Sequence, residues 1–436
     1  MPALYLSLFQ ALIISLFALT SCVSEDDSLD TALSKRGEPL PIVMIHGALA
    51  SGDTYARHAM LWGSNGYESD LLYVFDWNSL GGANAQALSA LDAYIDQIRT
   101  KTGKSKVYLV GHSAGGGLGY SYCSVAARAQ KVSKYVHLAS NPQTKPAGPA
   151  GEIPTLNIFS TADKVVAGAN MSGATNVVFD NLDHYEVATS PQSFERIHNF
   201  LLEEGSAITT LVPMDAPKIT GRVVTLGENK AISTVKVRVF ETEGATGIRR
   251  RIPIAEFTPD ADGRFGPLAV RPDTHHEFEI TSEDPEFRTL HYYREPFVRD
   301  NPFLYLRTFP PAASFAGIIL SNLPKDDCQS VVAVFTANQA VIHGRDTLFA
   351  GKTELSTPQL CSPTNSTIAM FLYDGGDMKT SGNGHAAFGF VPFLKGADVY
   401  NPTSSLETIA LTFNGRRMGV RNFKSATEGV IIAVFD

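Results

Sequence analysis

This 436-residue chain has few cysteines and fewer basic than acidic residues. Its 36 lysines and arginines are outnumbered by 44 aspartates and glutamates, which gives a formal charge of -8, and no basic stretch is interleaved with aromatic residues. Such a balance disfavours nonspecific attraction to nucleic acid, so we expect no nucleic-acid partner. The four cysteines and eleven histidines form no cluster with the spacing of a zinc site. The sequence therefore predicts no bound metal.

The apolar run at residues 1–22 is short for a membrane-spanning helix, and serine and glutamine interrupt it. It has the length of an export signal and ends in small residues, although no lysine or arginine precedes it. Its last four residues, Leu19-Thr20-Ser21-Cys22, resemble the lipobox of bacterial lipoproteins, in which the cysteine becomes the acylated N-terminus. That resemblance implies a signal peptide over residues 1–22, acyl chains on Cys22 and a polar tether over residues 23–38.

These features of the N-terminus predict an exported protein. Acyl chains on Cys22 would anchor it to a membrane, so the expected location is the cell envelope, at the outer membrane or the cell surface. If the lipobox is not used, the protein is secreted and Cys22 is lost. Export also places the other cysteines in an oxidising compartment, where Cys328 and Cys361 could form a disulfide. Cys123 is expected to be a small buried residue rather than a reactive thiol.

The length of the chain predicts two or three domains, of which the first covers residues 39–208. Short apolar runs alternate there with amphipathic stretches, a pattern typical of a mostly parallel sheet with helices on both faces. The sequence thus predicts an α/β fold. Strands are expected at Ile42 to Ile45, Leu71 to Phe75, Val107 to Val110, Tyr135 to Leu138, Leu156 to Phe159 and Val177 to Phe179, and helices near Ala83 to Thr100, Ala114 to Ala129 and Pro191 to Leu202.

Beyond about Ile208, apolar and polar residues alternate, and Gly, Asp or Pro punctuate the pattern. Such a period of two predicts antiparallel strands with one buried face. It is clearest at Lys218 to Val224, Thr234 to Phe240 and Phe278 to Thr281. We therefore expect an all-β C-terminal region, with one β domain over residues 209–310 and either a second β domain or a continuation over residues 311–436. The segment Phe309-Pro310-Pro311 marks the expected seam.

Gly111-His112-Ser113-Ala114-Gly115 fits the pattern G-x-S-x-G and lies between an apolar strand and an expected helix. A nucleophilic serine on a sharp turn from strand to helix requires this context. The flanking glycines make room in a turn where Cβ atoms would collide. At the N-terminus of a helix, backbone N–H groups and the helix dipole favour the negative charge that develops beside the serine. Ser113 is therefore the candidate nucleophile.

A serine hydroxyl needs a base to take its proton, and in this kind of fold the chain order is serine, acid, histidine. His184 follows the strand that ends at Phe179 and precedes the helix that begins at Pro191, which makes it the candidate base. His137 and His198 fall inside expected elements and are interpreted as structural.

Asp163 is the candidate acid, because it follows the strand that ends at Phe159 at the same carboxyl edge of the sheet as Ser113. Its alternative role is to cap the loop that follows. Asp183 is a poorer candidate, since neighbours in sequence such as Asp183 and His184 rarely present their side chains to each other. Asp180 and Glu152 are the least favoured candidates for the acid.

Acyl transfer also requires N–H donors that point at the oxyanion. The N–H of Ala114, the residue after the nucleophile, is one candidate. The second should come from the turn after the first strand, where Gly47 permits a tight bend, and Ala48 is preferred to Leu49. We interpret His46 as a structural brace for this turn.

Together these segments resemble the α/β-hydrolase superfamily, specifically lipases and esterases with a His-Gly oxyanion turn. Segments such as Ile153-Pro154-Thr155-Leu156 and the stretch from His291 to Asp300 are similar to archaeal lipases that carry a C-terminal β-barrel lipid-binding domain. The resemblance implies that the chain hydrolyses carboxylic esters and that its β region helps it to meet lipid.

Two departures from that family affect the prediction. The alternative position of the acid, after the preceding strand, falls at Ser140-Asn141, which has no carboxylate, and this favours Asp163. Relatives also carry a helical lid before the nucleophile strand, but the segment from Phe75 to Val107 has room for little more than one helix. We therefore expect an open crevice without a lid.

The predicted function is a serine hydrolase, a lipase or carboxylesterase, that cleaves a lipid or small ester through an acyl-enzyme on Ser113 without a cofactor. Leu49, Val165, Val166 and Val187 are expected to line the acyl pocket. One alternative is a surface binding or adhesion lipoprotein with a vestigial hydrolase domain. Another is a hydrolase of polyesters, thioesters or amides, since the same three residues serve those reactions.

Overall fold

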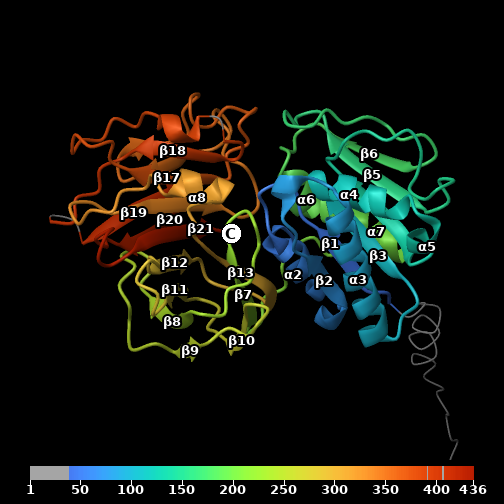
Figure 1. The fold of residues 1–436 in the computed structure, drawn as a ribbon, viewed down its shortest axis with the longest axis horizontal. Coiled ribbons are helices and arrows are strands. Elements are labelled where there is room, and N and C mark those ends of the chain that lie inside the picture. The colour runs from blue at the N-terminus through green and yellow to red at the C-terminus, as the bar shows by residue number, and fades with distance from the viewer. Residues whose placement is uncertain (1–38, 390, 405–406) are drawn as a thin grey trace, which may run out of the picture. The chain divides into compact units, whose positions relative to one another are not determined.

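The computed structural model describes residues 39–389, 391–404 and 407–436 (Figure 1). The expected signal peptide, the lipobox residue Cys22 and the tether of residues 23–38 lie outside the described residues. None of the helices in the described ranges combines the length and the apolar character that crossing a membrane requires.

The α/β region, residues 41–202, is built on a six-stranded parallel sheet with the order β2-β1-β3-β4-β5-β6. Its strands are β1 (Ile42–Ile45), β2 (Leu72–Phe75), β3 (Val107–His112), β4 (Val132–Leu138), β5 (Thr155–Ser160) and β6 (Thr175–Phe179). Parallel neighbours need crossover connections, which helices mostly supply here. The predicted α/β fold is confirmed. Strand β6 is an edge strand and, unlike β1 and β5, is only partly buried.

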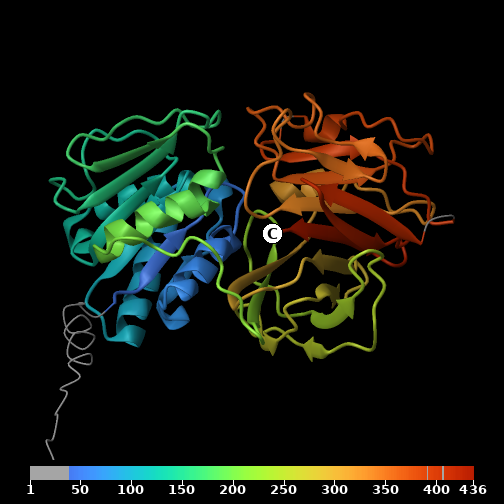
Figure 2. The same cartoon turned by 180° about the vertical axis from the view of Figure 1, so that it is seen from behind.

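Helices cover both faces of this sheet, because successive strand residues point to opposite sides. On β1, Ile42 and Met44 pack in a cluster with residues of α2 and α7, whereas Val43 and Ile45 pack with residues of α3 and α4. Figure 2 shows α7 in green and α2 in blue on the near face of the sheet. The helices are α2 (Ala56–Ser64), α3 (Ala85–Thr102), α4 (Ala114–Cys123), α5 (Ala126–Ala129), α6 (Glu186–Thr189) and α7 (Pro191–Leu202), with 3₁₀ turns η1 (Gly52–Tyr55), η2 (Ser69–Leu71) and η3 (Ser79–Gly81).

The β region, residues 218–435, contains three sheets. An eight-stranded sheet has the order β18-β17-β14-β21-β12-β11-β8-β9, and smaller sheets have the orders β10-β7-β13 and β16-β15-β19-β20. The elements are β7 (Lys218–Thr225), β8 (Lys236–Thr242), β9 (Ala255–Phe257), β10 (Arg264–Ala269), β11 (His275–Thr281), β12 (Leu290–Arg294), β13 (Asn301–Thr308), α8 (Phe315–Leu320), β14 (Val332–Thr336), β15 (Leu348–Ala350), β16 (Thr353–Glu354), β17 (Ala369–Tyr373), η4 (Ala386–Phe388), β18 (Leu394–Asp398), β19 (Thr408–Phe413), β20 (Arg416–Arg421) and β21 (Val430–Phe435).

The eight-stranded sheet is buried on both faces, as strand β21 shows. Its residues Val430, Ile432 and Val434 belong to one core cluster, and the alternate residues Ile431, Ala433 and Phe435 belong to another. The first cluster includes residues of the three-stranded sheet, and the second includes residues of the four-stranded sheet. The β region is therefore a three-layered structure with two cores.

Of the two forms expected for residues 311–436, the structure agrees with a continuation of the first β segment, whereas the expected strand direction needs correction. Strand β12 lies before the expected seam at Phe309-Pro310-Pro311, yet it pairs with β21 at the C-terminal end of the chain, so one sheet unites the two expected segments. The strands are also not all antiparallel, because β7 with β13, β21 with β12 and with β14, and β17 with β18 pair in parallel. A period of two indicates a buried face and leaves strand direction open.

The disulfide considered possible between Cys328 and Cys361 is not formed, and both thiols are free. Cys361 is fully buried in a β-region core and its thiol lies 3.4 Å from the carbonyl oxygen of Leu355, whereas Cys328 is exposed. Burial raises the pKa of Cys361 to about 12, so this thiol is protonated and unreactive at neutral pH. Cys123 is buried in the α/β core, as predicted.

Candidate active site

Ser113 lies at the sharp turn between β3 and α4, with backbone angles φ +53° and ψ -123°. A residue other than glycine rarely adopts a positive φ, and such strain is concentrated at functional sites. The flanking glycines have the role that the sequence predicts. A Cβ atom on Gly111 would lie 2.5 Å from the carbonyl oxygen of Gly115, and one on Gly115 would lie 2.4 Å from those of Ile45 and His46.

The structure brings Ser113, His184 and Asp163 together, although 71 and 21 positions separate the hydrogen-bonded pairs. The Oγ of Ser113 lies 3.0 Å from Nε2 of His184, and Nδ1 of His184 lies 2.7 Å from Oδ2 of Asp163. Asp163 follows β5, and His184 lies between β6 and α6. With the imidazole proton on Nδ1, His184 donates to the carboxylate and Nε2 is free to accept the serine proton.

The Asp163 carboxylate is held in its charged form. Burial favours the neutral acid, but the hydrogen bond and charge of His184, together with the N–H groups of Val166 and Val165, outweigh burial and lower the pKa of Asp163. Its Oδ1 accepts from these two N–H groups at 3.0 and 2.7 Å, while Oδ2 faces His184. Asp163 thus has both of the roles considered for it, the partner of the histidine and the cap of the loop.

His112, the residue before Ser113, contacts His184, and nothing in the sequence pattern indicates this contact. Its Nε2 lies 2.9 Å from the carbonyl oxygen of His184, and the two rings are 4.8 Å apart. Burial, with a smaller effect of His184, lowers the pKa of His112 to about 3. The ring is therefore neutral, and its Nε2–H donates to the backbone of the histidine loop.

The turn after β1 lies beside Ser113, as expected. Gly47 and Ala48 line the same small cavity as Ser113 and His184. The N–H of Leu49 donates to Oγ of Ser79 at 2.9 Å, which removes Leu49 as an alternative oxyanion donor. Ala114 is the first residue of α4, where backbone N–H groups have no partner within the helix.

Two family models and several solved structures are similar to parts of this chain. Residues 41–170 match the family described as alpha/beta hydrolase fold, and residues 215–311 match the family described as Lipase C-terminal domain. The chain is similar to the mature lipase BlEst2 of Bacillus licheniformis, with 16% identity over 38% of this chain and 96% of that chain and a TM-score of 0.30. It is also similar to carboxylesterase CesB of Bacillus subtilis, with 13% identity over 39% of this chain and 86% of that chain and a TM-score of 0.29.

The chain has an α/β-hydrolase fold followed by a β-rich region, of which residues 215–311 are similar to the lipase C-terminal family. The predicted α/β-hydrolase fold is thereby confirmed, and the family matches support a hydrolase in general terms. The second match ends at residue 311, whereas the eight-stranded sheet of this hydrolase also contains strands from beyond that residue.

His46 braces the turn after β1, the candidate oxyanion turn. Its Nδ1–H donates to the carbonyl oxygen of Gly47 at 2.8 Å, and its Nε2 accepts from the N–H of Trp77 at 3.2 Å. The side chain is fully buried, and burial lowers the pKa of His46, so the ring is neutral at physiological pH. These contacts agree with the structural role predicted for it.

Asn229, on the turn after β7, reaches from the β region into this brace and is 7% exposed. Its Nδ2 lies 2.8 Å from the carbonyl oxygen of Ala50 and 3.2 Å from Nε2 of His46, and its Oδ1 accepts from Oγ of Ser51 at 2.7 Å. One side chain of the β region therefore holds both ends of the oxyanion turn.

The histidine loop of the hydrolase is held in a similar way. Oδ1 of Asp183 accepts from the N–H groups of Tyr185 and Glu186, while Oδ2 accepts from the N–H of Ala340 at 3.0 Å and from Arg345 at 2.8 Å. Arg345 also pairs with Glu186 at 2.7 Å. Asp183 is thus engaged with the β region rather than with the His184 ring, which agrees with its rejection as the triad acid.

The two least favoured acids do not replace Asp163 either. Asp180 is exposed, and the carboxylate of Glu152 accepts from the N–H of Ala150 at 2.9 Å and so caps its own loop. Asp163 is therefore the carboxylate that the structure pairs with His184.

No helical lid lies between β2 and β3, where the described chain forms only η3 and α3. The site is nevertheless bordered, because Ile368 and Phe393 of the β region line the cavity beside Ser113. His184 is only 2% exposed. The expectation of an open crevice therefore needs correction. Of the residues expected in an acyl pocket, Leu49 lines an adjoining cavity, whereas Val187 is fully buried in the α/β core.

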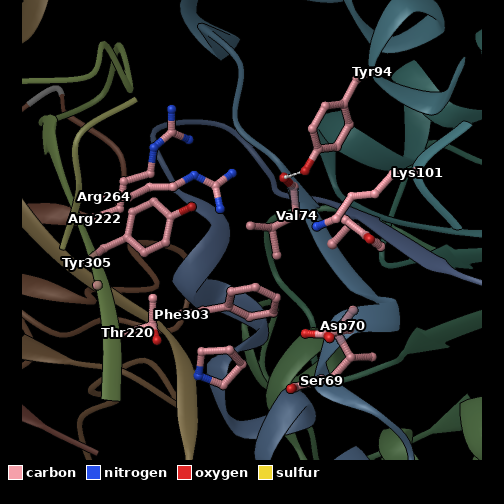
Figure 3. A pocket seen from close by; sticks show the side chains of 14 residues that line it. Ser69, Asp70, Val74, Tyr94, Lys101, Thr220, Arg222, Arg264, Phe303 and Tyr305 are labelled. Carbon is pink, nitrogen blue, oxygen red and sulfur yellow. Dashed lines mark hydrogen bonds between the residues drawn. The ribbon is translucent and has the colours of Figure 1, made fainter. Parts of the chain in front are cut away.

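A larger cavity, of about 240 Å³, is lined by residues of β2 and of strands of the β region. Figure 3 shows side chains of its lining, among them Tyr94, Lys101 and Arg222. Arg222, Arg264 and Lys101 line it, and none of Ser113, Asp163 and His184 does. Arg222 and the hydroxyl of Tyr305 both bond to Asp76, whose other oxygen accepts from the N–H of Gly52. This cavity therefore marks a polar junction between the α/β and β regions, apart from the candidate triad.

Proposed function

We propose that the protein is a serine esterase that cleaves carboxylic esters through an acyl-enzyme on Ser113. The observation that carries this proposal is the continuous hydrogen-bonded line from Ser113 Oγ through His184 to Asp163, with distances of 3.0 and 2.7 Å, at a strained turn from strand to helix. The family matches give the broader class, a hydrolase.

In the proposed reaction, Ser113 Oγ attacks the ester carbonyl carbon while His184 Nε2 accepts the serine proton. Asp163 keeps the other imidazole proton on Nδ1 and stabilises the imidazolium. The N–H groups of Ala114 and Ala48 hold the oxyanion of the tetrahedral intermediate. His184 then gives its proton to the departing alkoxide, and water, deprotonated by the same histidine, attacks the acyl group and releases the acid. Apart from water, these steps use groups of the chain and of its ester substrate.

Replacing Ser113 with alanine tests the proposal. We expect Ser113→Ala to lose at least about 1,000-fold in kcat for p-nitrophenyl acetate, because the nucleophile is gone. The fold should be retained, as measured by circular dichroism, and a fluorophosphonate probe should label wild type at Ser113 and leave the variant unlabelled. Unchanged turnover in Ser113→Ala would remove the serine from the mechanism. It would favour the alternative that the β region is the working part of an adhesion protein.

For the location, we propose that the protein is a lipoprotein of the cell envelope, anchored by acyl chains on Cys22. The support is the sequence from Leu19 to Cys22. The variant Cys22→Ser should move from the membrane fraction to the soluble exported fraction. Wild type in the soluble fraction with a free N-terminus beyond residue 22 would instead indicate secretion.

A further inference from the structure

The space beside Ser113 is narrow and adjoins a second small cavity. The first cavity, of about 20 Å³, contains Ser113 and His184 in its lining, and the second, of about 50 Å³, extends into the β region. Ala50, Tyr185, Ile368 and Phe393 line both. A single water needs about 10 to 15 Å³, so the first cavity has room for only one or two atoms of that size. Drug-sized ligands usually occupy pockets of about 300 to 1,000 Å³.

Phe393 is the aromatic residue that the β region contributes to this shared wall, and it has an uncommon backbone. Its φ is +66°, a conformation that is an outlier for a bulky side chain. Its ring lies 6.1 Å from the His184 imidazole and almost parallel to it, at an interplanar angle of 9°. Backbone strain at a residue whose ring faces the proposed base points to a role at the site.

Strands of the β region fix the position of this ring. Phe393 directly precedes β18 and Ile368 directly precedes β17, and these two strands pair in parallel. The carbonyl oxygen of Phe393 accepts from the N–H of Ile368 at 2.9 Å and from that of Ala369 at 3.1 Å. The two wall residues are therefore tied to each other at matching ends of a sheet. A wall on such rigid elements holds its geometry better than one on a free loop.

The cavity behind this wall is suited to an apolar group. Its lining includes Leu226, Phe335, Leu394 and Val434. The charged side chains in it are already paired, Arg307 with Asp53 and Arg294 with Asp436. An entering group would therefore meet hydrocarbon surface and few unsatisfied polar atoms.

We infer that Phe393 is a specificity-determining residue, whose ring closes the end of the slot beside Ser113. One substituent of the ester, its acyl or its alcohol group, is thereby restricted to a short apolar chain. The inference rests on the proposed esterase function and names its substrate class, esters with a short apolar group on one side. Removal of the ring joins the slot to the apolar cavity behind it and admits longer chains.

The acyl group is tested with p-nitrophenyl esters from acetate to decanoate. Wild type should have its highest kcat/KM between acetate and butyrate. Phe393→Ala and Phe393→Gly should raise the ratio of kcat/KM for octanoate to that for acetate by about tenfold or more, the discrimination that a few methylene groups allow. Phe393→Trp should lower the ratio for butyrate to acetate. Glycine suits a positive φ, so Phe393→Gly keeps the test valid if the alanine variant folds poorly.

The matched control is Phe349→Ala, a partly buried phenylalanine on β15 of the β region that lines neither cavity. Its octanoate-to-acetate ratio should equal that of wild type. A parallel series of alkyl acetates tests the alcohol group, and a shift in either series supports the inference and shows which group occupies the slot.

Two results would overturn the inference. One is a wild-type optimum at octanoate or longer, and the other is an unchanged chain-length profile of both Phe393→Ala and Phe393→Gly in both series. Each counts only if the fluorophosphonate probe labels Ser113 in these proteins. Absence of labelling in folded wild type is a different outcome, because it rejects the esterase itself.

Discussion

The nucleophile turn and the two loops beside it are held in different ways. The turn at Ser113 is held within the α/β region. Gly111 and Gly115 let the backbone pack closely there without a clash, and Oγ of Ser140 donates to the Ser113 carbonyl oxygen at 2.6 Å. The oxyanion turn and the histidine loop instead depend on side chains of the β region, Asn229 and Arg345. The β region is therefore part of the site as well as a C-terminal domain.

This difference separates two kinds of residue in the proposed mechanism. Some must hold a proton or a charge, and their loss removes a step of the reaction. Others only keep a loop in place, and their loss lets the loop move while the step remains possible. Substitutions of the two kinds of residue should therefore differ in the size of their effect on activity and in the step or loop that they affect.

The largest difference in kcat is expected between substitutions of two acids, Asp163, which pairs with His184, and Asp183, which precedes His184 in the chain. Asp163→Asn should lower kcat by about 10,000-fold, since an amide can donate to His184 and so favours the tautomer that cannot accept the serine proton. Asp183→Asn leaves Asp163 in place and so keeps the productive His184 tautomer, with the proton on Nδ1; it should cost far less, because only the link from the histidine loop to Arg345 is weakened. Steady-state kinetics with p-nitrophenyl acetate measure both. Equal losses would mean that Asp183 takes part in the proton transfer.

A smaller loss is expected for Asn229→Ala. Loss of a whole oxyanion donor costs about 100- to 1,000-fold, and a loosened turn should cost less, so we expect kcat to fall about tenfold with little change in KM. The control is Asn65→Ala, which removes an amide with hydrogen bonds to Leu61 and Ile208 at the end of α2. That variant should lose stability without losing kcat. A normal kcat for Asn229→Ala would show that the oxyanion turn keeps its shape without the β region.

The candidate triad could be predicted from sequence because its signals are local. Ser113 lies in a short motif between a strand and a helix, and Asp163 and His184 follow apolar strands whose carboxyl ends meet at one edge of a parallel sheet. A single topological rule, that parallel strands end at the same edge, relates these distant positions. Their catalytic roles remain predictions, which the substitutions at Ser113 and Asp163 test.

The residues of the β region could not be predicted in this way. Alternation along a strand shows that one face is buried, but it does not say which strands pair, so nothing placed Phe393 or Asn229 beside the serine. Helix α2 was missed for a related reason. Its buried face includes His58 and Ala59 together with Leu61 and Trp62, which makes the apolar period weak. Continuous burial of β21, by contrast, is readable in its unbroken apolar sequence.

The smallest expected effect is on stability, at Glu186 beside the histidine loop. Burial and the Asp183 carboxylate raise the pKa of Glu186 to about 7 from an ordinary value of 4.5, although the Asp183 N–H and Arg345 favour its charged form. A raised pKa means that the folded protein binds this proton more tightly than the unfolded chain. The contribution to stability is therefore complete below about pH 4.5 and is lost as the pH rises through 7.

The variant Glu186→Gln cannot titrate, so its free energy of unfolding should fall less than that of wild type between pH 4.5 and 7. Urea unfolding of both proteins at several pH values gives the two curves, and their difference isolates Glu186 from the other titrating groups. Because glutamine can still accept the Asp183 N–H, kcat at neutral pH should change little. If the two free energies of unfolding change with pH in parallel, water or movement of the Arg345 loop relieves the burial of Glu186. The contact between the β region and the histidine loop would then be looser than the distances indicate.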